Sequence, residues 1–443
     1  MSPNLRLAGA RALVARVVGI AAAQSLYWVA FLWRRALRKT TFVAVTGTHG
    51  KTTAKEMLAA ILGSRSPTLR TFDNENTGVL LTRNLLRVRP RHRFAVLELG
   101  VGAPGEMRRL ARLVRPDVAL VLTVLRTHVK AFGDRGAHAA EKAILLEELR
   151  PRGTAVLNAD DPLVAAMAAS VRGTVVMSGT SPQCDVWAEG ATSAWPERLE
   201  FDVRSRDGES CRVRTRLVGR HWCAAATAAL AAARAMGVPL AAGAAALGDV
   251  EPFRARMQPL LLPSGAVVVR DEYDGSIDTF EAGVRFLADA RAERRVAVVS
   301  DVSDYGSTMR RKRVAHLGRE LARVAEVVVF VGRAAAHGRD AARAAGVAAE
   351  SARSFVDLRE AAEFLRATLR RGDLVYLKGR VSDHMSRLFF AQLGRVACWK
   401  TDCDLRIVCD RCPELGTPPT DLAKAVPAPL QRTAEPGPAL DAR

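Results

Sequence analysis

The sequence predicts an α/β protein with two parts: a central phosphate-loop domain with a mostly parallel sheet, and a smaller Rossmann-like C-terminal domain. Three observations support this prediction. A β-branched run at residues 43–45 opens into a glycine loop and then a helix start. Strand-like apolar runs alternate with helical patterns from residue 41 to about residue 130, which is typical of a parallel sheet with crossover helices. The same alternation restarts in the last third of the chain.

The central domain is expected to contain strands at residues 42–45, 94–97, 118–124, 154–157 and 175–177, with helices at 52–62 and 105–114. Alternating short runs at residues 199–203 and 211–217 indicate an antiparallel ribbon. Two alanine-rich helices follow, at residues 222–236 and 239–248. A boundary is expected near residues 250–256, where Pro252 precedes a new strand pattern.

The C-terminal domain is expected to contain strands at residues 266–271, 295–299, 327–331 and 374–378, and helices at 277–291, 309–324, 336–346 and 357–371. The predicted organisation is therefore an apolar and basic helix at residues 1–40, the ATP-binding domain at 41–252, the C-terminal domain at 253–396, a four-cysteine module at 397–416 and a tail at 417–443. We expect the tail to be disordered, because it combines proline, alanine and charge without periodicity.

Composition excludes some classes of protein. The 443 residues are 49% hydrophobic, which is enough for real cores. The net charge of +20 would raise nucleic acid as a partner, but only nine of the 66 basic residues are lysine, which indicates a general arginine bias. No basic run is interleaved with aromatic residues, so we expect no nucleic-acid partner. The seven cysteines are too sparse for a secreted disulfide framework, and a reducing cytoplasm is expected.

Residues 17–33 are mostly apolar and are followed by Arg34, Arg35, Arg38 and Lys39. Three interpretations stay open: a helix packed on the domain, an interfacial helix attracted to anionic lipid, and a membrane span at the short limit of length. A secretory signal peptide is not expected, because no small-residue cleavage site is evident. Peripheral membrane contact through residues 1–40 is thus one predicted interaction.

Residues 46–53 read T-G-T-H-G-K-T-T and form a phosphate cradle. Glycines let backbone N–H groups converge on phosphate oxygens, and the following helix directs its positive end at them. Lys51 adds a charge and the Thr52 hydroxyl can hold Mg²⁺, so ATP is the expected ligand. The first glycine of the common phosphate-loop spacing is replaced by Val45, and a glycine-rich turn before an ordinary helix is the alternative. The predicted nucleotide-binding residues of the loop are Gly47, Thr48, Gly50, Lys51, Thr52 and Thr53.

Four cysteines near the end, Cys398, Cys403, Cys409 and Cys412, are spaced C-x4-C-x5-C-x2-C. This number and compactness predict a structural tetrathiolate zinc site. Four free cysteines in a cytosolic tail are the alternative.

Several motifs in order along residues 41–395 together resemble the Mur ligase family, whose members join an acid to an amine at the expense of ATP. Besides the phosphate loop they are N-E-N-T-G-V at 74–79, A-V-L-E-L-G at 95–100, P-G-E at 104–106, R-P-D-V-A at 115–119, T-H at 127–128, E-K at 141–142, N-A-D-D at 158–161, G-R-H at 219–221, R-M-Q at 256–258, D-E-Y at 271–273, R-V-A-V-V-S-D at 295–301, G-D-L at 372–374 and K-G at 378–379.

The resemblance implies roles for individual residues. It assigns Thr52 and Glu98 to the Mg²⁺ of ATP and His128 to a second metal ion, and it makes Lys142 the lysine that the family carbamylates. Each of three residues also has an alternative. Glu98 could be a solvated acid at a strand end, and His128 a structural histidine. Lys142 could be a helix-surface lysine paired with an acid. Further nucleotide-binding residues that it implies are Asn158, His221 and Asp271, and substrate-binding residues are Asn76, Thr77, Tyr273 and Lys378.

In the C-terminal domain the resemblance makes Arg256 the arginine that approaches the γ-phosphate when the domains close, Asp271 the acid that contacts the ribose, and Lys378 the lysine that meets the acidic substrate. A salt bridge or an ordinary surface charge could explain any one of these three residues.

The sequence also departs from the family pattern. Ala225 stands where an asparagine helps hold the nucleotide, and Arg380 replaces the serine of K-G-S. Residues 273–277 read Y-D-G-S-I instead of Y-N-A-N-P, at the place where the second substrate would bind. A UDP-sugar domain of roughly a hundred residues usually precedes the phosphate loop, whereas 45 residues precede Thr46 here, so we expect this domain to be lacking.

The predicted function is an ATP-dependent carboxylate–amine ligase that works through an acyl phosphate, with ATP and Mg²⁺ as cofactors and small-molecule acid and amine substrates. The alternative is a catalytically altered nucleotide-binding regulatory protein tethered at the membrane. A phosphate-loop kinase or GTPase would carry a base-recognition motif and the common glycine spacing, neither of which is seen.

Overall fold

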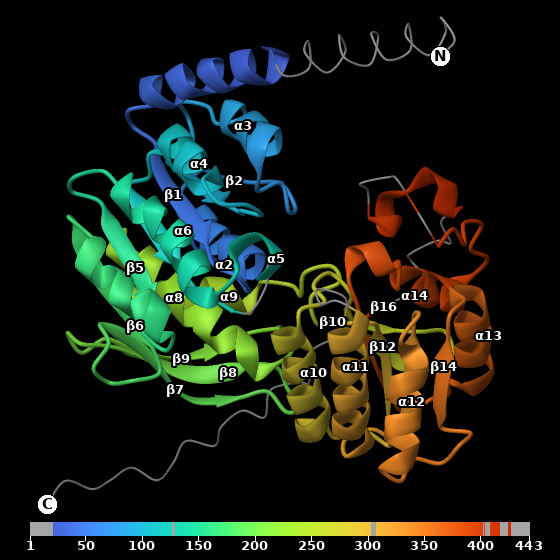
Figure 1. Ribbon diagram of the computed structural model, residues 1–443. Coiled ribbons are helices and arrows are strands. Elements are labelled where there is room, and N and C mark those ends of the chain that lie inside the picture. The colour runs from blue at the N-terminus through green and yellow to red at the C-terminus, as the bar shows by residue number, and fades with distance from the viewer. Residues whose placement is uncertain are drawn as a thin grey trace, which may run out of the picture. The chain divides into compact units, whose positions relative to one another are not determined.

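The computed structural model of the chain describes residues 21–125, 129–302, 307–401, 403, 408–416 and 424–426. They form two compact units, each with a sheet and a buried apolar cluster of its own (Figure 1). The first unit contains the described residues up to Thr192, Leu199–Glu251 and Ser276–Asp278. The second contains Ser193–Arg198, Pro252–Gly275 and the described residues from Thr279 onwards. The predicted α/β class is confirmed.

The first unit is built on a nine-stranded sheet with the order β2-β3-β1-β4-β5-β6-β7-β8-β9. Its pairs are parallel up to β7, and β7, β8 and β9 form an antiparallel ribbon. All five predicted strands and the predicted ribbon are present, whereas β2 and β7 were not expected. The strands are β1 (Thr41–Thr46), β2 (Thr68–Arg70), β3 (Phe94–Glu98), β4 (Val118–Val121), β5 (Thr154–Asn158), β6 (Thr174–Gly179), β7 (Val186–Thr192), β8 (Glu200–Ser205) and β9 (Ser210–Arg214).

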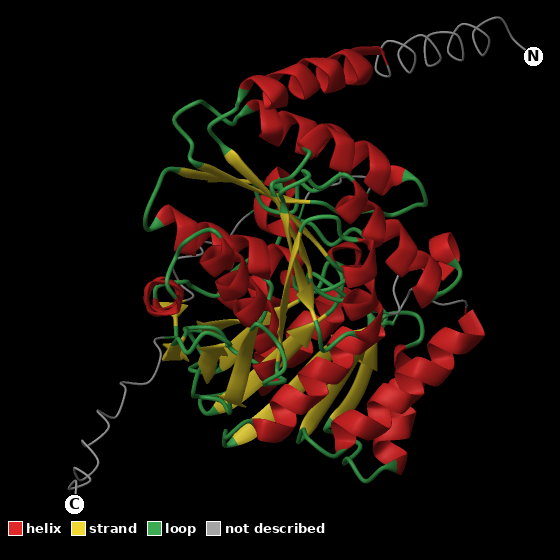
Figure 2. Ribbon diagram, turned by 90° about the vertical axis from the view of Figure 1, so that its left-hand side faces the viewer, coloured by secondary structure: helices red, strands yellow, loops and turns green. Residues whose placement is uncertain are grey.

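Helices cover this sheet (Figure 2). On one face α2 packs against α8, and α8 contacts β5, β6 and β7. On the other face α4 and α6 contact each other, and their apolar residues join the cluster that contains Ala44, Leu97 and Val121. The helices are α2 (Lys51–Gly63), α3 (Gly78–Leu86), α4 (Glu106–Val114), α5 (Val129–Phe132), α6 (Arg135–Glu147), α7 (Pro162–Ala165), α8 (Cys223–Ala235) and α9 (Leu240–Gly248).

Residues 21–36 form a helix that packs on the first unit. Ala30 and Leu37 are buried in its apolar cluster. The Arg34 guanidinium donates from Nε to Val114 O at 2.6 Å and from Nη2 to Arg115 O at 2.7 Å, at the carboxyl end of α4. Of the three interpretations of this segment, packing on the domain describes these residues; residues 1–20 lie outside the described part. No helix within the described residues has both the length and the apolar character needed to cross a bilayer.

The second unit has a seven-stranded sheet with the order β14-β13-β12-β15-β11-β10-β16, in which β10 and β16 are antiparallel to their neighbours. All of its predicted strands and helices are present. Its elements are β10 (Gln258–Leu261), β11 (Val267–Asp271), α10 (Ile277–Asp289), β12 (Arg294–Ser300), α11 (Ser307–Ala322), β13 (Val327–Val331), α12 (Ala335–Ala344), β14 (Ala352–Phe355), α13 (Leu358–Thr368), β15 (Asp373–Lys378), α14 (Ser386–Leu393) and β16 (Lys424–Ala425).

The strand β16 corrects the prediction of a tail without structure. Leu260 and Leu261 of β10 pair with Ala425 and Lys424. The edge strand β10 offers unpaired backbone groups, which explains how a segment without an apolar pattern is recruited to the sheet. The rest of residues 417–443 lies outside the described part.

Candidate active site

The phosphate loop joins the end of β1 to the start of α2 and is held by the segment after β4. Gly50 is the N-cap of α2 with a left-handed φ of 79°. At Gly47, where φ is 149°, a Cβ atom would lie 3.0 Å from Leu122 Cβ, so only glycine fits. The Thr48 N–H donates to Thr123 O at 2.6 Å. This geometry leaves the amino end of α2 aimed at the loop, the arrangement that binds phosphate.

Two lysines meet at this loop. The Lys51 Nζ donates to Thr48 O at 3.1 Å. Lys142 comes from α6 and is 2% exposed, and its Nζ donates to Gly47 O at 3.2 Å. Burial, and next the charge of Lys51, lower the pKa of Lys142 well below its ordinary value. A lowered pKa favours the neutral form of an amine, which is the form that reacts with carbon dioxide.

Glu141 does not pair with Lys142. Its carboxylate accepts from Gly105 N at 2.9 Å and from Met107 N at 2.7 Å, and it thereby caps the amino end of α4. The alternative of a surface lysine paired with an acid therefore does not describe the geometry of Lys142.

Glu98 ends β3 in a buried polar network. Its Oε1 accepts from Asn76 Nδ2 at 2.8 Å, and Asn76 Nδ2 also donates to Asn74 Oδ1 at 2.9 Å. The Thr52 hydroxyl lies 3.5 Å from the same Asn74 oxygen. Glu98 Oε2 is buried and has no hydrogen-bond partner among the described residues. Glu98, through Asn76, and the Thr52 hydroxyl are both linked to Asn74 Oδ1, and their oxygens are of the kind that Mg²⁺ prefers as ligands.

Lys55 belongs to this network, although the sequence analysis did not select it. The side chain is fully buried, and its Nζ donates to Thr71 O at 2.9 Å and to Asp73 O at 2.7 Å. The same atom lies 2.9 Å from Glu56 Oε1 and 3.9 Å from Glu98 Oε2. One sequence signal could have identified Lys55. Most basic residues of this chain are arginine, yet a lysine stands one helical turn after Lys51.

Aromatic rings lie behind the phosphate loop. The His49 ring stacks on Trp222 with a centroid distance of 5.3 Å, and His221 lies 4.4 Å from the same indole. A Cβ atom at Gly219 would lie 2.5 Å from His221 Cε1, so this glycine is required for the position of the ring. The predicted nucleotide residue His221 is thus brought to the loop. A Cβ atom at Gly50 would meet Ala225 Cβ at 3.6 Å, so this departure from the family pattern also lies at the loop.

For the other predicted residues of the first unit, the structure gives local contacts or burial only. Asn158 ends β5, and its Oδ1 accepts from Asp160 N at 3.2 Å in a local turn. Thr53 is buried behind the loop, whereas Thr77 is exposed at the N-cap of α3. His128 lies outside the described residues.

Two predicted residues of the second unit, Lys378 and Asp271, contact each other. Lys378 and Asp271 are register partners at the ends of β15 and β11, and Lys378 Nζ lies 2.8 Å from Asp271 Oδ2. The Tyr376 hydroxyl donates to the same oxygen at 2.9 Å, and burial, followed by the Asp271 charge, raises the Tyr376 pKa well above its ordinary value. The salt-bridge alternative therefore describes Lys378 and Asp271 in this structure.

The Arg256 guanidinium carbon lies 4.5 Å from the centre of the Tyr273 ring. Its neighbours Ala255 and Met257 have φ values of 54° and 53°, which non-glycine residues rarely adopt. Strain of this kind is concentrated at functional sites.

The predicted zinc site is not supported. All four cysteines are described, and no group of three or more histidine, cysteine, aspartate or glutamate side chains among the described residues could hold a metal ion. Cys409 Sγ instead lies 3.3 Å from His384 Nδ1, and burial raises the Cys409 pKa. Burial thus favours the thiol over the thiolate that binds zinc.

Comparisons with known proteins identify the family of the chain. The family model described as Mur ligase middle domain matches residues 45–233, and the one described as Mur ligase, glutamate ligase domain matches residues 255–381. A relative named UDP-N-acetylmuramoyl-tripeptide--D-alanyl-D-alanine ligase, from Mycobacterium tuberculosis, is 31% identical over 357 residues, which are 76% of this chain and 70% of the relative. The Escherichia coli protein of the same name is 32% identical over 277 residues, 62% of this chain and 61% of the relative.

Among solved structures, a crystal structure of MurF from Acinetobacter baumannii matches with a TM-score of 0.76 and 27% identity, covering 83% of this chain and 79% of that one. MurF ligase from Thermotoga maritima in complex with ADP has the same fold, with a TM-score of 0.71 and 21% identity, covering 83% of this chain and 82% of that one. The comparisons give no support to the regulatory alternative. The chain belongs to the Mur ligase family and is an ATP-dependent amide-bond-forming ligase of the MurF type.

Proposed function

We propose that the residues described above perform the two steps of an acyl-phosphate ligase. Lys51 and the loop amides hold the phosphates of ATP while a substrate carboxylate oxygen attacks the γ-phosphorus and ADP leaves. The nitrogen of an amine then attacks the acyl carbon, phosphate leaves, and the nitrogen loses a proton. Mg²⁺, when bound, supplies positive charge that neutralises the phosphate oxygens.

We propose Thr52 and Glu98 as the Mg²⁺ ligands, because a buried Glu98 oxygen has no hydrogen-bond partner among the described residues and belongs to the network that contains Thr52. For a second ion we propose His128 and a carbamylated Lys142. In the second unit we propose Arg256 for the γ-phosphate, Asp271 for the ribose, and Lys378 and Tyr273 for the substrates. The observation that carries the proposal is the burial of the Lys142 amine against Gly47 O beside Lys51, where its pKa is low.

The relatives are named for joining D-alanyl-D-alanine to a UDP-N-acetylmuramoyl-tripeptide. We propose this pair as the first acid and amine to test here. Because residues 273–277 and Arg380 depart from the family pattern, other amines must be included in the test.

The experiment is phosphate release from ATP with Mg²⁺, supplied with that pair and with pools of carboxylic acids, amino acids and dipeptides. Wild type is compared with Lys142→Ala, with Glu98→Gln and with Lys312→Ala, an exposed lysine of α11 that serves as the control. Release that needs a carboxylate, Lys142 and Glu98, but not Lys312, supports the proposal. Tight ATP binding without turnover under any pool would favour the regulatory alternative.

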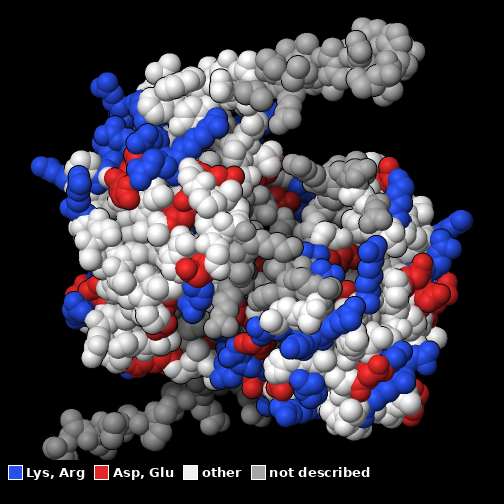
Figure 3. Space-filling model, viewed as in Figure 1, with Lys and Arg blue, Asp and Glu red and all other residues white. Residues whose placement is uncertain are grey.

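We also propose that the helix at residues 21–36 contacts an anionic membrane surface. Its outward side exposes Trp28, Val29 and Leu32, at 60%, 57% and 66%, while Ala30 is buried on the other side. Figure 3 shows Lys and Arg atoms gathered beside this helix. The arginines that border the groove along it are Arg35, Arg108, Arg109 and Arg112. An exposed tryptophan with flanking cations suits the interface of an anionic bilayer.

The test is flotation with phosphatidylcholine vesicles that contain or lack phosphatidylglycerol. Binding to the anionic vesicles alone, lost in the double variant Trp28→Ser with Leu32→Ser, supports this contact. Val356→Ser is the matched control, because Val356 is 68% exposed in the second unit. Equal flotation of all variants, or no flotation, contradicts it.

A further inference from the structure

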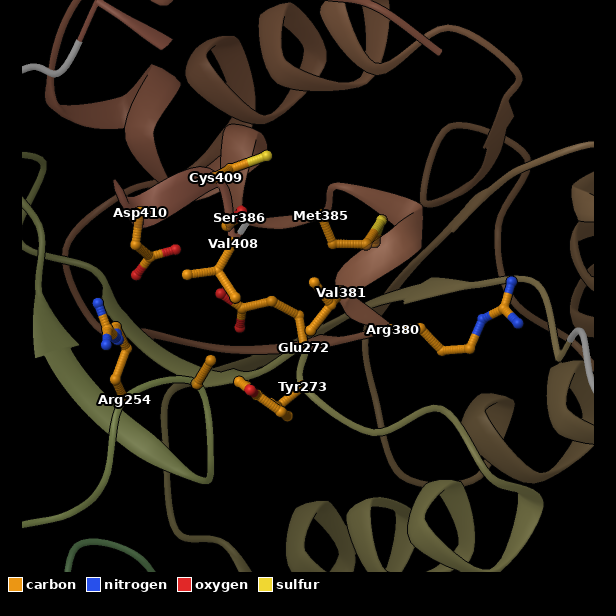
Figure 4. A pocket seen from close by; sticks show the side chains of 11 residues that line it. Arg254, Glu272, Tyr273, Arg380, Val381, Met385, Ser386, Val408, Cys409 and Asp410 are labelled. Carbon is orange, nitrogen blue, oxygen red and sulfur yellow. The ribbon is translucent and has the colours of Figure 1, made fainter. Parts of the chain in front are cut away.

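Charge balance distinguishes two pockets of the described residues. The first lies at the end of β11 in the second unit and has a cavity volume of about 20 Å³, which is room for one water molecule (Figure 4). Three arginines and three carboxylates lie in or beside it, so its charges balance when the acids are ionised and no charged ligand is needed. These residues are Arg254, Arg270, Arg380, Glu272, Asp383 and Asp410.

The second pocket is a groove between the helix at residues 21–36 and α4 in the first unit. Its volume is about 890 Å³, which is in the size range of small-molecule sites. The helix contributes the aromatic side chains of Tyr27, Trp28 and Phe31 to its lining. The charged residues that border the groove are four arginines and one glutamate: Arg35, Arg108, Arg109, Arg112 and Glu148.

Two of these four arginines are neutralised by acids. Arg108 Nη2 lies 2.8 Å from Glu147 Oε2, and Arg112 Nε lies 3.0 Å from Glu148 Oε1. The other two, Arg35 and Arg109, form no ion pair with a carboxylate in the part of the chain that the structure describes.

No further acid compensates Arg35 and Arg109. The helix at residues 21–36 contains no acidic residue. Glu106, the acidic residue of α4, accepts from Gly102 N at 2.7 Å and from Ala103 N at 3.2 Å, so it serves its own loop. The groove therefore has a surplus of two positive charges.

The two uncompensated guanidinium groups are held close together by aromatic rings. The Arg35 guanidinium carbon lies 3.1 Å from the centre of the Phe31 ring, and that of Arg109 lies 4.8 Å from the centre of the Tyr27 ring. The two rings are stacked with their centroids 6.3 Å apart. Arg35 also donates to Phe31 O at 3.0 Å and to Arg112 O at 3.2 Å. These contacts orient the guanidinium groups without neutralising them, and paired guanidinium groups suit phosphate oxygens.

Exposed apolar side chains lie directly beside this groove. Trp28 lines it and is 60% exposed, and Val29 and Leu32 on the same helix are 57% and 66% exposed. Val29 and Leu32 also line a second groove of about 500 Å³ with Trp33, Ala36, Leu86 and Arg89. A cationic groove next to an exposed apolar surface suits an amphiphile with an anionic headgroup and a hydrocarbon chain.

We propose that the groove binds the headgroup of a lipid phosphomonoester, the class to which phosphatidic acid belongs. A phosphomonoester carries a charge of about −1.5 to −2 at pH 7, which matches the two surplus positive charges. The hydrocarbon chain lies against Trp28, Val29 and Leu32. A soluble phosphate ester has the same headgroup chemistry but no chain to cover these side chains. This proposal rests on the proposed membrane contact and specifies its lipid.

The first test is flotation of the full chain with phosphatidylcholine vesicles that contain either phosphatidic acid or phosphatidylglycerol, adjusted to the same zeta potential. Equal potentials make the non-specific attraction equal, so a difference in binding reports the headgroup. We expect binding to the phosphatidic acid vesicles to be about tenfold tighter. Equal binding to both kinds of vesicle overturns the phosphomonoester site and retains the membrane contact, whereas binding to neither overturns both.

Variants then locate the site. Arg109→Gln is the mildest change, because the Arg109 side chain is exposed and its guanidinium contacts only the Tyr27 ring among the described residues. We expect it to weaken the preference for phosphatidic acid, and Arg35→Gln with Arg109→Gln to abolish it. The matched control is Arg83→Gln with Arg87→Gln, which removes the same charge from exposed arginines at the carboxyl end of α3 and should keep the preference. An unchanged preference in the first double variant overturns the proposal.

The last test separates a lipid from a soluble phosphate ester. Isothermal titration with sn-glycerol 3-phosphate, the headgroup of phosphatidic acid without its chains, is compared with titration by the phosphatidic acid vesicles. We expect the soluble headgroup to bind more weakly by about tenfold or more, because it buries no apolar surface. Equal affinities would make a soluble phosphate ester the ligand and overturn the lipid assignment. None of these assays needs turnover, so the ligase function is tested independently.

Discussion

At the scale of single residues, the site is defined by charged groups that the fold removes from water. Lys142 loses its hydration against Gly47 O, and Lys55 is enclosed by Thr71 O and Asp73 O. The two lysines differ in their partners. Lys55 has Glu56 and Glu98 within 4 Å, so its charge is compensated, whereas at Lys142 the charge of Lys51 lowers the pKa and the smaller effect of Glu141 opposes this shift. We therefore expect opposite effects when each lysine is replaced.

Lys142→Met should reduce ATP turnover about 10²–10³-fold without lowering thermal stability. The pKa of Lys142 in the folded protein is depressed below its unfolded value of 10.5, so the unfolded chain binds more protons between the two values. The cost of burying the amine is therefore greatest below the folded pKa and fades as the pH rises towards 10.5. Denaturant titrations from pH 6 to pH 10 should show an advantage of the Met variant that shrinks with rising pH. An advantage that grows with pH would contradict this account.

Lys55→Met should destabilise the protein by about 3–5 kcal/mol, because it leaves the buried Glu98 carboxylate without its cation and frees two carbonyl groups. Urea unfolding followed by circular dichroism measures the change, with Lys312→Met as the exposed control. A loss below about 1 kcal/mol would mean that the contacts of Lys55 are not energetically important.

At the scale of elements, two helices begin at glycines of the same conformation. Gly50 caps α2 with φ 79°, and Gly105 caps α4 with φ 86°. A Cβ atom at Gly105 would meet nothing within 4 Å, whereas at Gly50 it would meet Ala225 and Leu122 at 3.6 Å, which is ordinary contact. Gly50 and Gly105 thus have the same left-handed backbone conformation. Only the helix that begins at Gly50 belongs to the phosphate loop.

Gly50→Ala and Gly105→Ala should each lower the free energy of unfolding by about 1–2 kcal/mol, the cost of a left-handed conformation with a side chain. Only Gly50→Ala should also weaken binding of a fluorescent ATP analogue, because the loop amides must converge on phosphate. If Gly105→Ala weakens nucleotide binding equally, the loss reflects stability alone and the assignment of the loop is wrong.

At the scale of the whole molecule, the two units have separate sheets and separate buried clusters. The phosphate loop, Glu98, Lys142 and His221 all belong to the first unit. A ligand that binds only the folded state stabilises by about 2.7 kcal/mol at a concentration of 100 Kd.

A non-hydrolysable ATP analogue with Mg²⁺ should therefore slow hydrogen exchange in residues 45–60 and in β3 and α6, as measured by mass spectrometry. Removing Mg²⁺ with a chelator should reverse the protection around Glu98 first. Protection confined to the second unit would contradict the placement of the phosphates.

The order of the strands and helices could be predicted from local patterns, because each element carries its own periodicity. The strands β2 and β7 could not, since β2 has three residues and β7 reads V-W-A-E-G-A-T without strict alternation. The zinc prediction is not supported, because spacing fixes how far apart cysteines are in the chain, but not whether their thiols converge. Cys409 and His384, which do meet, are 25 residues apart.

The sequence by itself determined the fold class, the phosphate loop and the family, because these depend on short motifs and on periodicity. Only the tertiary structure decided that Lys142 is a buried amine and that Lys55 forms an ion pair with Glu98. It also decided that Arg270 contacts both Glu272 and Asp410, although Asp410 lies 140 residues away in the chain. The reason is physical: pKa values, unpaired oxygens and pockets depend on which groups share a dry environment, and that is set by packing between elements distant in sequence.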